Sequence, residues 1–170
     1  MILFMGVDPG LETAVATVRW NGVAEKWDKF RTLTAPAGEA CDAVWTTFVV
    51  YAWTTHVGVE RYTMSGRTGN MTRQNDAIEV IGALRWMSRR WVGKPLTFDV
   101  VGAAEATKIG NHEMQRSINA WVRGAPDHVR RAVAQLIYVI SRRQPSLFAD
   151  LINGAKIERT ETYDQTWLVY

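Results

Sequence analysis

The sequence predicts a mixed α/β fold in which helices pack on both faces of one five-stranded sheet. Residues 2–8 form an apolar run without turn residues, as expected for a buried strand. Residues 11–20 and 23–33 have the pattern of two further strands, joined at the hairpin signal Asn21-Gly22. After this three-stranded meander, helical and strand patterns alternate along the chain, which indicates a sheet with helices packed on it.

The remaining elements follow from breakers and periodicity. A breaker at 34–38 precedes a predicted helix over 39–53, and a strand is expected over 56–62. Residues 63–75 contain no acid and are rich in Ser, Thr, Gly and Asn, so we expect a loop there. The later predictions are a helix over 76–91, a strand over 96–101, a helix over 112–121 and a last helix opened by Pro126.

Two of these helices have an apolar stripe at helical spacing. In the helix over 76–91 the stripe comprises Ala77, Ile78, Ile81, Leu84 and Met87. In the last helix it comprises Val129, Ala132, Val133, Leu136, Ile137 and Ile140. Each stripe is expected to pack against the sheet.

Composition places the chain among globular proteins of one domain. It has 170 residues, of which 47% are hydrophobic and 22% charged. No apolar stretch is long enough for a membrane span, and the N-terminus lacks the features of a secretory signal, so we expect a cytoplasmic protein without membrane contact. The single cysteine, Cys41, excludes an intramolecular disulfide and a Cys-rich zinc site.

Positive charge is concentrated in one segment. Residues 61–143 hold 14 Lys and Arg against 6 Asp and Glu, a net +8, whereas the rest of the chain has a net −5. Such a segment is either a solvated helix face or a surface that binds a polyanion through its phosphates.

Four side chains suited to metal binding stand at ends of predicted elements. Asp8 ends the first strand, Glu60 lies near the end of the strand over 56–62, and Asp127-His128 open the last helix. Hard oxygen ligands of this kind suit Mg²⁺, and two such ions can activate water for phosphodiester hydrolysis. Each residue also has a structural interpretation: Asp8 as a turn former, Glu60 as the partner of Arg61 in a surface ion pair, and Asp127-His128 as a helix cap.

In sequence order, these motifs resemble one nuclease family. Gly6-Val7-Asp8-Pro9-Gly10, Val59-Glu60-Arg61-Tyr62 and the late helix from Asp127 are similar to the RuvC-type Holliday junction resolvases, and the small size looks closest to phage-encoded members. The resemblance covers residues 1–143 and implies a ribonuclease H-like nuclease domain, followed by an extension of unknown role over 144–170. It implies a homodimer that cleaves Holliday junctions and other branched DNA, in the host cytoplasm if the chain is phage-encoded.

The resemblance also implies a cofactor and site residues. The cofactor is Mg²⁺, with two ions expected and Mn²⁺ as a substitute. The implied catalytic residues and metal ligands are Asp8, Glu60, Asp127 and His128. Implied DNA contacts are Arg61, Tyr62, Arg67, Arg73 and Lys108, and residues 76–85 resemble the dimer-facing helix.

One position departs from the family pattern. The run Ala132-Val133-Ala134-Gln135-Leu136 sets the register, which places His128 at the first position of the last motif and Arg131 where a further acid is expected. At about 100° per residue, His128 flanks the apolar stripe, whereas Asp127 and Arg131 point away from it. Either Asp127 substitutes as the acid, or a second metal ion is held weakly.

Three other functions compete with cleavage of junctions. The first is a protein that binds junctions but cleaves them weakly or not at all, because Arg131 replaces an expected acid. An ATPase or sugar kinase is suggested by Asp8-Pro9-Gly10 with Thr13, although such enzymes need a longer chain. A nuclease of the same fold that processes ribosomal RNA is the nearest rival, because it shares the predicted site.

Overall fold

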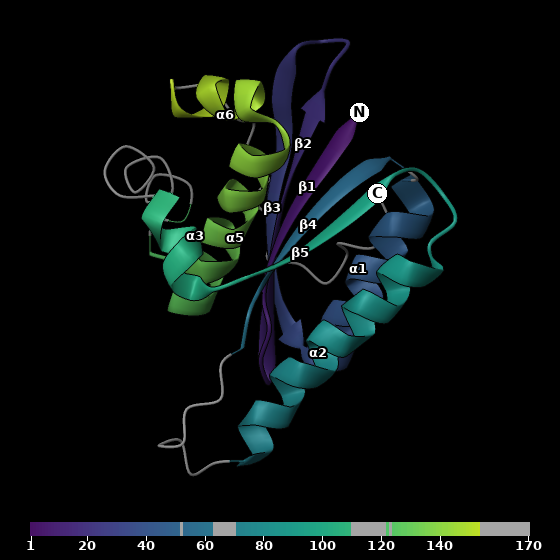
Figure 1. Cartoon of the computed structure of the whole chain (residues 1–170), viewed down its shortest axis with the longest axis vertical. Coiled ribbons are helices and arrows are strands. Elements are labelled where there is room, and N and C mark those ends of the chain that lie inside the picture. Colours follow the sequence, from purple (N-terminus) through teal and green to yellow (C-terminus); the bar gives the residue numbers. More distant parts are fainter. Residues whose placement is uncertain (52, 63–70, 110–121, 123, 154–170) are drawn as a thin grey trace.

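The structure, a computed structural model, describes residues 1–51, 53–62, 71–109, 122 and 124–153 (Figure 1). Its centre is a five-stranded sheet with the order β3-β2-β1-β4-β5. β1 pairs antiparallel with β2 and parallel with β4, and β4 pairs parallel with β5. The strands are β1 (Ile2–Asp8), β2 (Glu12–Asn21), β3 (Lys26–Pro36), β4 (Thr54–Glu60) and β5 (Leu96–Val101).

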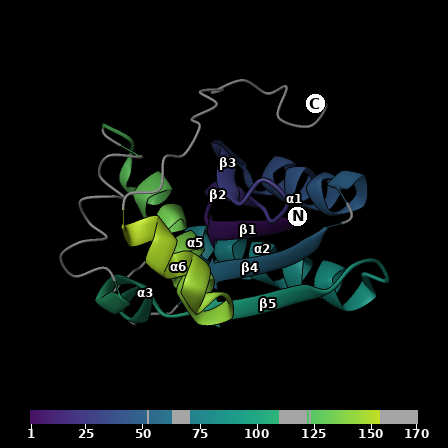
Figure 2. The same ribbon diagram turned by 90° about the horizontal axis from the view of Figure 1, so that it is seen from above.

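Helices cover both faces of this sheet, as the two views show (Figures 1 and 2). α1 (Ala37–Tyr51) and α2 (Met71–Arg90) pack on one face, and α5 (Asp127–Arg143) crosses the other. Two short helices, α3 (Ala103–Ile109) and α6 (Pro145–Ile152), contact α5. The predicted class, a mixed α/β sheet with helices on both faces, is confirmed.

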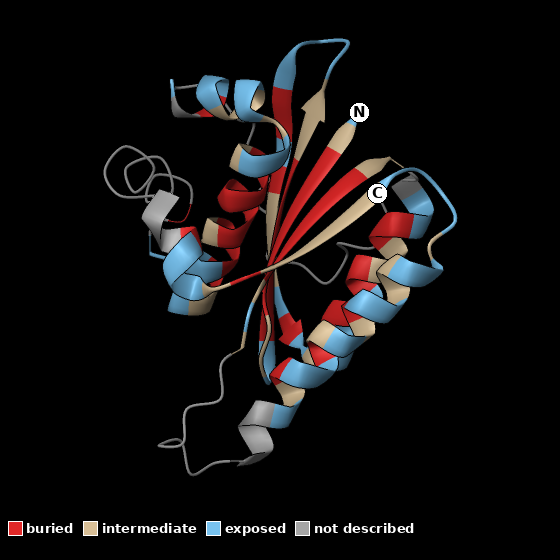
Figure 3. Ribbon diagram, viewed as in Figure 1, coloured by how far each residue is buried: buried red, intermediate tan, exposed pale blue. Residues whose placement is uncertain are grey.

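Alternation along β1 produces two cores, one on each side of the sheet. Phe4 belongs to the core under α5, while Leu3, Met5 and Val7 belong to the core under α1 and α2. The inner strands are accordingly buried on both faces (Figure 3). Asp8 is four residues after Phe4 in the same strand, so its side chain lies on the same face of the sheet, the one covered by α5.

α5 lies unusually close to the sheet because two glycines sit beneath it. Gly6 of β1 and Gly58 of β4 are direct partners across the parallel pair. A Cβ at Gly6 would collide with the backbone of Ala132 and Leu136, and one at Gly58 would lie 2.8 Å from the carbonyl oxygen of Gln135. The predicted apolar stripe of α5 is buried against this surface.

The hairpin between β2 and β3 differs from the sequence prediction. Asn21 pairs with Lys26, so the loop has four residues rather than a tight turn at Asn21-Gly22. The Asn21 side-chain oxygen accepts hydrogen bonds from the backbone N–H groups of Val23 (3.1 Å) and Ala24 (3.2 Å), which stabilises the longer loop. β3 also continues through the predicted breaker to Pro36, which an edge strand tolerates.

The predicted loop over 63–75 is wrong at its end, because α2 already begins at Met71. In α2, Ala77 and Leu84 are buried as predicted, but Ile78 is 44% exposed. The helix predicted over 112–121 lies outside the described residues. Beyond residue 143, α6 packs on α5 and contributes Leu151 to the core.

None of the described helices has both the length and the hydropathy of a membrane span.

Candidate metal centre

Asp8 and Glu60 lie side by side at the carboxyl ends of two neighbouring parallel strands. The register pairs Val7 with Val59, so the two carboxylates follow at the same level of the sheet. Both belong to the strand positions that face α5, as Gly6 and Gly58 do. Asp8 is 8% exposed, and Glu60 is half-buried. The sequence-predicted pair is therefore brought together beneath α5.

Burial and mutual repulsion make this pair unfavourable when it is ionised. The pKa of Asp8 is raised to about 7, mainly because burial removes its carboxylate from water. The negative charge of Glu60 raises this pKa further, whereas the positive charge of Arg131 lowers it. Burial also raises the pKa of Glu60, while Arg131 and the nearby amide of Gln135 lower it. A cation bound between the two carboxylates would relieve both effects.

Arg131 and Gln135 reach this pair from α5. They are one helical turn apart, and although Arg131 is exposed, its charge acts on both carboxylates. The helical geometry expected from the sequence directs Arg131 away from the apolar stripe, and the residue is exposed, yet its positive charge lowers the pKa of both carboxyl groups.

Gln135 is the site residue that sequence reasoning missed. It is 1% exposed, and neither its Oε1 nor its Nε2 makes a hydrogen bond of ordinary geometry to any described residue. Its amide still acts on Glu60, whose pKa it lowers, so it belongs to the same site, and an amide so deeply buried is stabilised by a further polar partner there. The available signal was one polar residue inside an otherwise apolar helical run.

His128 and Asp127 occupy the first turn of α5, away from the carboxylate pair. His128 Nε2 lies 3.3 Å from Thr34 Oγ1 on β3. Thr34 shares a row of the sheet with Ala14 and Asp8, so His128 faces the sheet as its helical position predicts. Two strand spacings place Thr34 roughly 10 Å from Asp8. Asp127 is exposed.

No group of three or more His, Cys, Asp or Glu side chains converges on one point in the described part of the chain. The donors that do converge are two carboxylates and the amide of Gln135. These are hard oxygen donors of the kind that Mg²⁺ and Mn²⁺ prefer, with remaining positions filled by water. The residues present therefore fit a divalent metal held by few protein ligands.

The expected DNA contacts are only partly described. Arg61 is exposed, its backbone N–H donates to the carbonyl of Val101 (2.6 Å), and Tyr62 is half-buried next to it. Arg67 lies outside the described residues. Arg73 is in α2 and Lys108 in α3, but their side chains are likewise not described.

Stability should depend on pH through Asp8. Because the pKa of Asp8 is about 7 in the folded protein against an ordinary value of 3.8, the folded state binds the proton more tightly than the unfolded state. This contribution to the free energy of unfolding is fully present below pH 3.8 and is lost as the pH rises through 7. We expect metal-free protein to lose up to about 4 kcal/mol between these values.

Urea unfolding at a series of pH values, in the presence of a chelator, measures this loss. Asp8→Asn should remove most of the slope, whereas Asp150→Asn, the same substitution at an exposed position of α6, should leave it unchanged. Equal slopes in wild type and Asp8→Asn would contradict a raised pKa at Asp8.

Comparisons with known proteins identify the fold. No family model matches the chain, and no curated protein matches it. Among solved structures, it is similar to Thermus thermophilus RuvC in complex with a Holliday junction substrate, with a TM-score of 0.58 and 13% identity over 85% of this chain and 97% of that one. A second structure of Thermus thermophilus RuvC gives a TM-score of 0.51 and 17% identity over 82% and 95% of the two chains. The chain therefore has the fold of RuvC.

Proposed function

We propose that this protein is a divalent-metal-dependent endonuclease that cleaves Holliday junctions and other branched DNA. The observation that carries the proposal is the pair Asp8 and Glu60, buried at neighbouring strand ends beneath α5 and unfavourable without a cation. The similar Thermus thermophilus RuvC structure, which is a complex with a Holliday junction substrate, supports the choice of DNA substrate.

In the proposed mechanism, Asp8 and Glu60 hold Mg²⁺, with two ions expected and Mn²⁺ as a substitute. When bound, the metal supplies an activated water and stabilises the charge on the leaving oxygen. Asp8, the more buried carboxylate at the end of β1, and Glu60 at the end of β4 would hold the ion between them. We assign Asp127 and His128, in the first turn of α5, as the further catalytic residues and metal ligands.

Phosphate contacts come from the basic segment. We assign them to Arg61 beside Glu60, to Arg67 and Arg73, and to Lys108 of α3, and these groups position the DNA without reading bases. We assign Tyr62 to stack on, or wedge beside, a base.

The proposed homodimer uses the outer face of α2. Ile78 is 44% exposed and Trp86 is 59% exposed, and Gly82 lies between them at the same helical spacing. A large aromatic side chain beside an aliphatic one on an exposed helix face is typical of a protein contact.

The proposal is tested with a synthetic four-way junction and a linear duplex of the same sequences. We expect nicks in the junction that require Mg²⁺ or Mn²⁺, and little cleavage of the duplex. Equal cleavage of both substrates would contradict structural selectivity. Preference for a folded RNA over the junction would favour an RNA-processing nuclease.

A second candidate is a protein that binds junctions but cleaves them weakly. Arg131 favours it, because its charge already acts on both carboxylates and takes part of the role of a cation. Junction binding without nicks under either metal would support this candidate.

Arg131→Asp separates the two candidates. The change removes the competing charge and adds an acid beside the pair, so we expect cleavage at limiting Mg²⁺ to rise about tenfold, equivalent to 1.4 kcal/mol. Initial nicking rates over a Mg²⁺ titration measure the gain. Arg130→Asp is the matched control, since it makes the same charge change at the neighbouring exposed position of α5. An equal response to both substitutions would show that only net charge matters.

A further inference from the structure

Gln135 is a polar side chain in the most buried part of α5. It is 1% exposed and lies next to the apolar stripe by which the helix packs on the sheet. A glutamine amide carries two N–H donors and an acceptor oxygen, and burying these groups without good partners costs free energy. An apolar side chain of similar volume would fill the same place at lower cost, so packing alone does not account for the amide.

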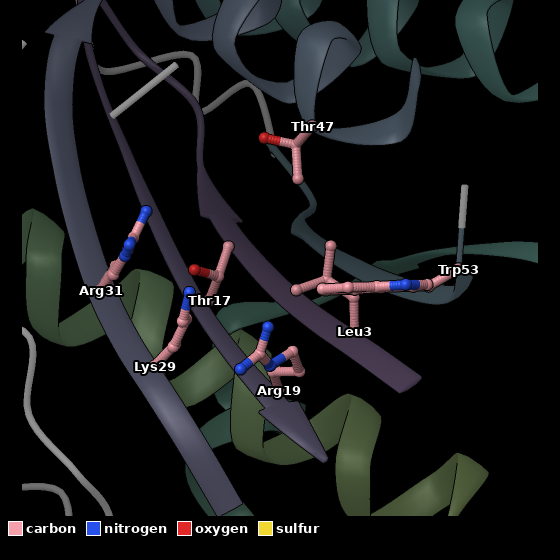
Figure 4. Close-up of a pocket in the computed structure, with 7 residues that line it drawn as sticks. All are labelled: Leu3, Thr17, Arg19, Lys29, Arg31, Thr47 and Trp53. Atoms are coloured by element: carbon pink, nitrogen blue, oxygen red, sulfur yellow. The ribbon is translucent and has the colours of Figure 1, made fainter. Parts of the chain in front are cut away.

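Polar side chains on the opposite face of the sheet have their partners within the fold. Figure 4 shows Arg19 and Thr47 at a small pocket on that face. Arg19 Nη2 donates to Asp28 Oδ2 (2.8 Å), and Thr47 Oγ1 donates to the carbonyl oxygen of Ala43 (2.7 Å). By contrast, neither polar atom of the Gln135 side chain makes a hydrogen bond of ordinary geometry to a described residue. The fold therefore explains those polar groups but not the amide of Gln135.

The place of Gln135 above β4 directs its side chain toward Glu60. A Cβ at Gly58 would lie 2.8 Å from the carbonyl oxygen of Gln135, so helix and strand are in close contact here. Glu60 is two residues further along β4 and faces α5 as Gly58 does. Helical side chains lean toward the N-terminus of their helix, and one turn in that direction is Arg131, whose charge also acts on Glu60. The amide and the Glu60 carboxylate thus lie in the same part of the site.

We propose that Gln135 is a positioning residue that holds the Glu60 carboxylate in place for a divalent cation, an inference that rests on the proposed metal centre. The Nε2 N–H group donates to one carboxylate oxygen of Glu60 and leaves the other oxygen to the ion. Carboxylates that bind metals are commonly held by such hydrogen bonds. Because Arg131 stands where an acid is expected, the centre has few carboxylates, and the orientation of each one matters more.

Calorimetric titration of Mn²⁺ into wild type and Gln135→Met at pH 8 tests this role without any cleavage. At this pH most Asp8 side chains are ionised, because their pKa is about 7. Methionine keeps the unbranched shape of glutamine but cannot donate a hydrogen bond. We expect the Kd for Mn²⁺ to rise about 10- to 100-fold in Gln135→Met, the usual effect of losing a residue that holds a metal ligand.

Urea unfolding in a chelator distinguishes a positioning role from a structural one. We expect the free energy of unfolding of Gln135→Met to stay the same or rise, because an apolar side chain of the same shape removes the cost of burying the amide. A residue that only supported the fold would behave in the opposite way, with lower stability and unchanged affinity for Mn²⁺.

Gln144→Met is the matched control, since it makes the same substitution at the C-cap of α5, about 13 Å further along the helix. It should bind Mn²⁺ as wild type does. The positioning role would be overturned by equal affinity of wild type and Gln135→Met, by an equal loss of affinity in both variants, or by a larger loss of stability in Gln135→Met than in Gln144→Met. These results would leave the centre at Asp8 and Glu60 intact, whereas absence of Mn²⁺ binding by wild type would overturn both.

Discussion

Asp8→Asn is expected to reduce metal-dependent cleavage of a four-way junction by about a thousandfold. The substitution preserves shape but removes the more buried of the two carboxylates. Loss of metal-assisted stabilisation of several kcal/mol corresponds to about three orders of magnitude in rate. Single-turnover nicking rates at saturating Mg²⁺ measure the change.

The same variant should be at least as stable as wild type at pH 8 without metal, because Asn cannot acquire the unfavourable charge that Asp8 carries there. Loss of activity together with unchanged or increased stability separates a chemical role from misfolding. Asp150→Asn should cleave at the wild-type rate. A fully active Asp8→Asn would exclude Asp8 from the reaction.

Gly6→Ala is expected to lower the free energy of unfolding by about 3 kcal/mol, the upper part of the range for overpacking. Its Cβ would collide with backbone atoms of Ala132 and Leu136, which cannot rotate away as a side chain would. α5 must then shift away from the sheet, and Arg131 and Gln135 shift with it. Urea unfolding and junction cleavage should therefore both report a loss.

Gly38→Ala is the control for this change. Gly38 is an exposed residue of α1 with no atom within 4 Å of an added Cβ, so alanine there should be neutral or stabilising by up to about 1 kcal/mol. If Gly6→Ala proved as stable as Gly38→Ala, close contact between α5 and the sheet would not hold the site together.

Strand alternation and helical stripes were sufficient to predict the sheet, because each is set by local sequence. Residues 2–8 and 96–101 form strands with the predicted bounds, and the stripe of α5 is buried as expected. The start of α2 was less predictable. Residues 71–75 show no apolar residues at helical spacing, but they still belong to the helix. The length of the hairpin loop depends on side-chain hydrogen bonds of Asn21, which composition does not reveal.

The candidate site was predictable only in its central pair. Asp8 and Glu60 stand at strand ends, and parallel pairing of β1 with β4 brings strand ends together. Gln135 depends on tertiary packing, because its amide reaches the site only when α5 lies on Gly6 and Gly58. The contact between His128 and Thr34 likewise joins residues far apart in sequence, and the role of His128 in cleavage stays a prediction.

The most direct test of the metal centre is calorimetric titration of Mn²⁺ into wild type and Asp8→Asn at pH 6, in buffers of different ionisation enthalpy. At this pH most Asp8 side chains carry a proton, because their pKa is about 7. We expect wild type to bind Mn²⁺ with release of close to one proton, and Asp8→Asn to bind it weakly and without proton release. Equal affinity and equal proton release in the two proteins would contradict a metal centre at Asp8 and Glu60.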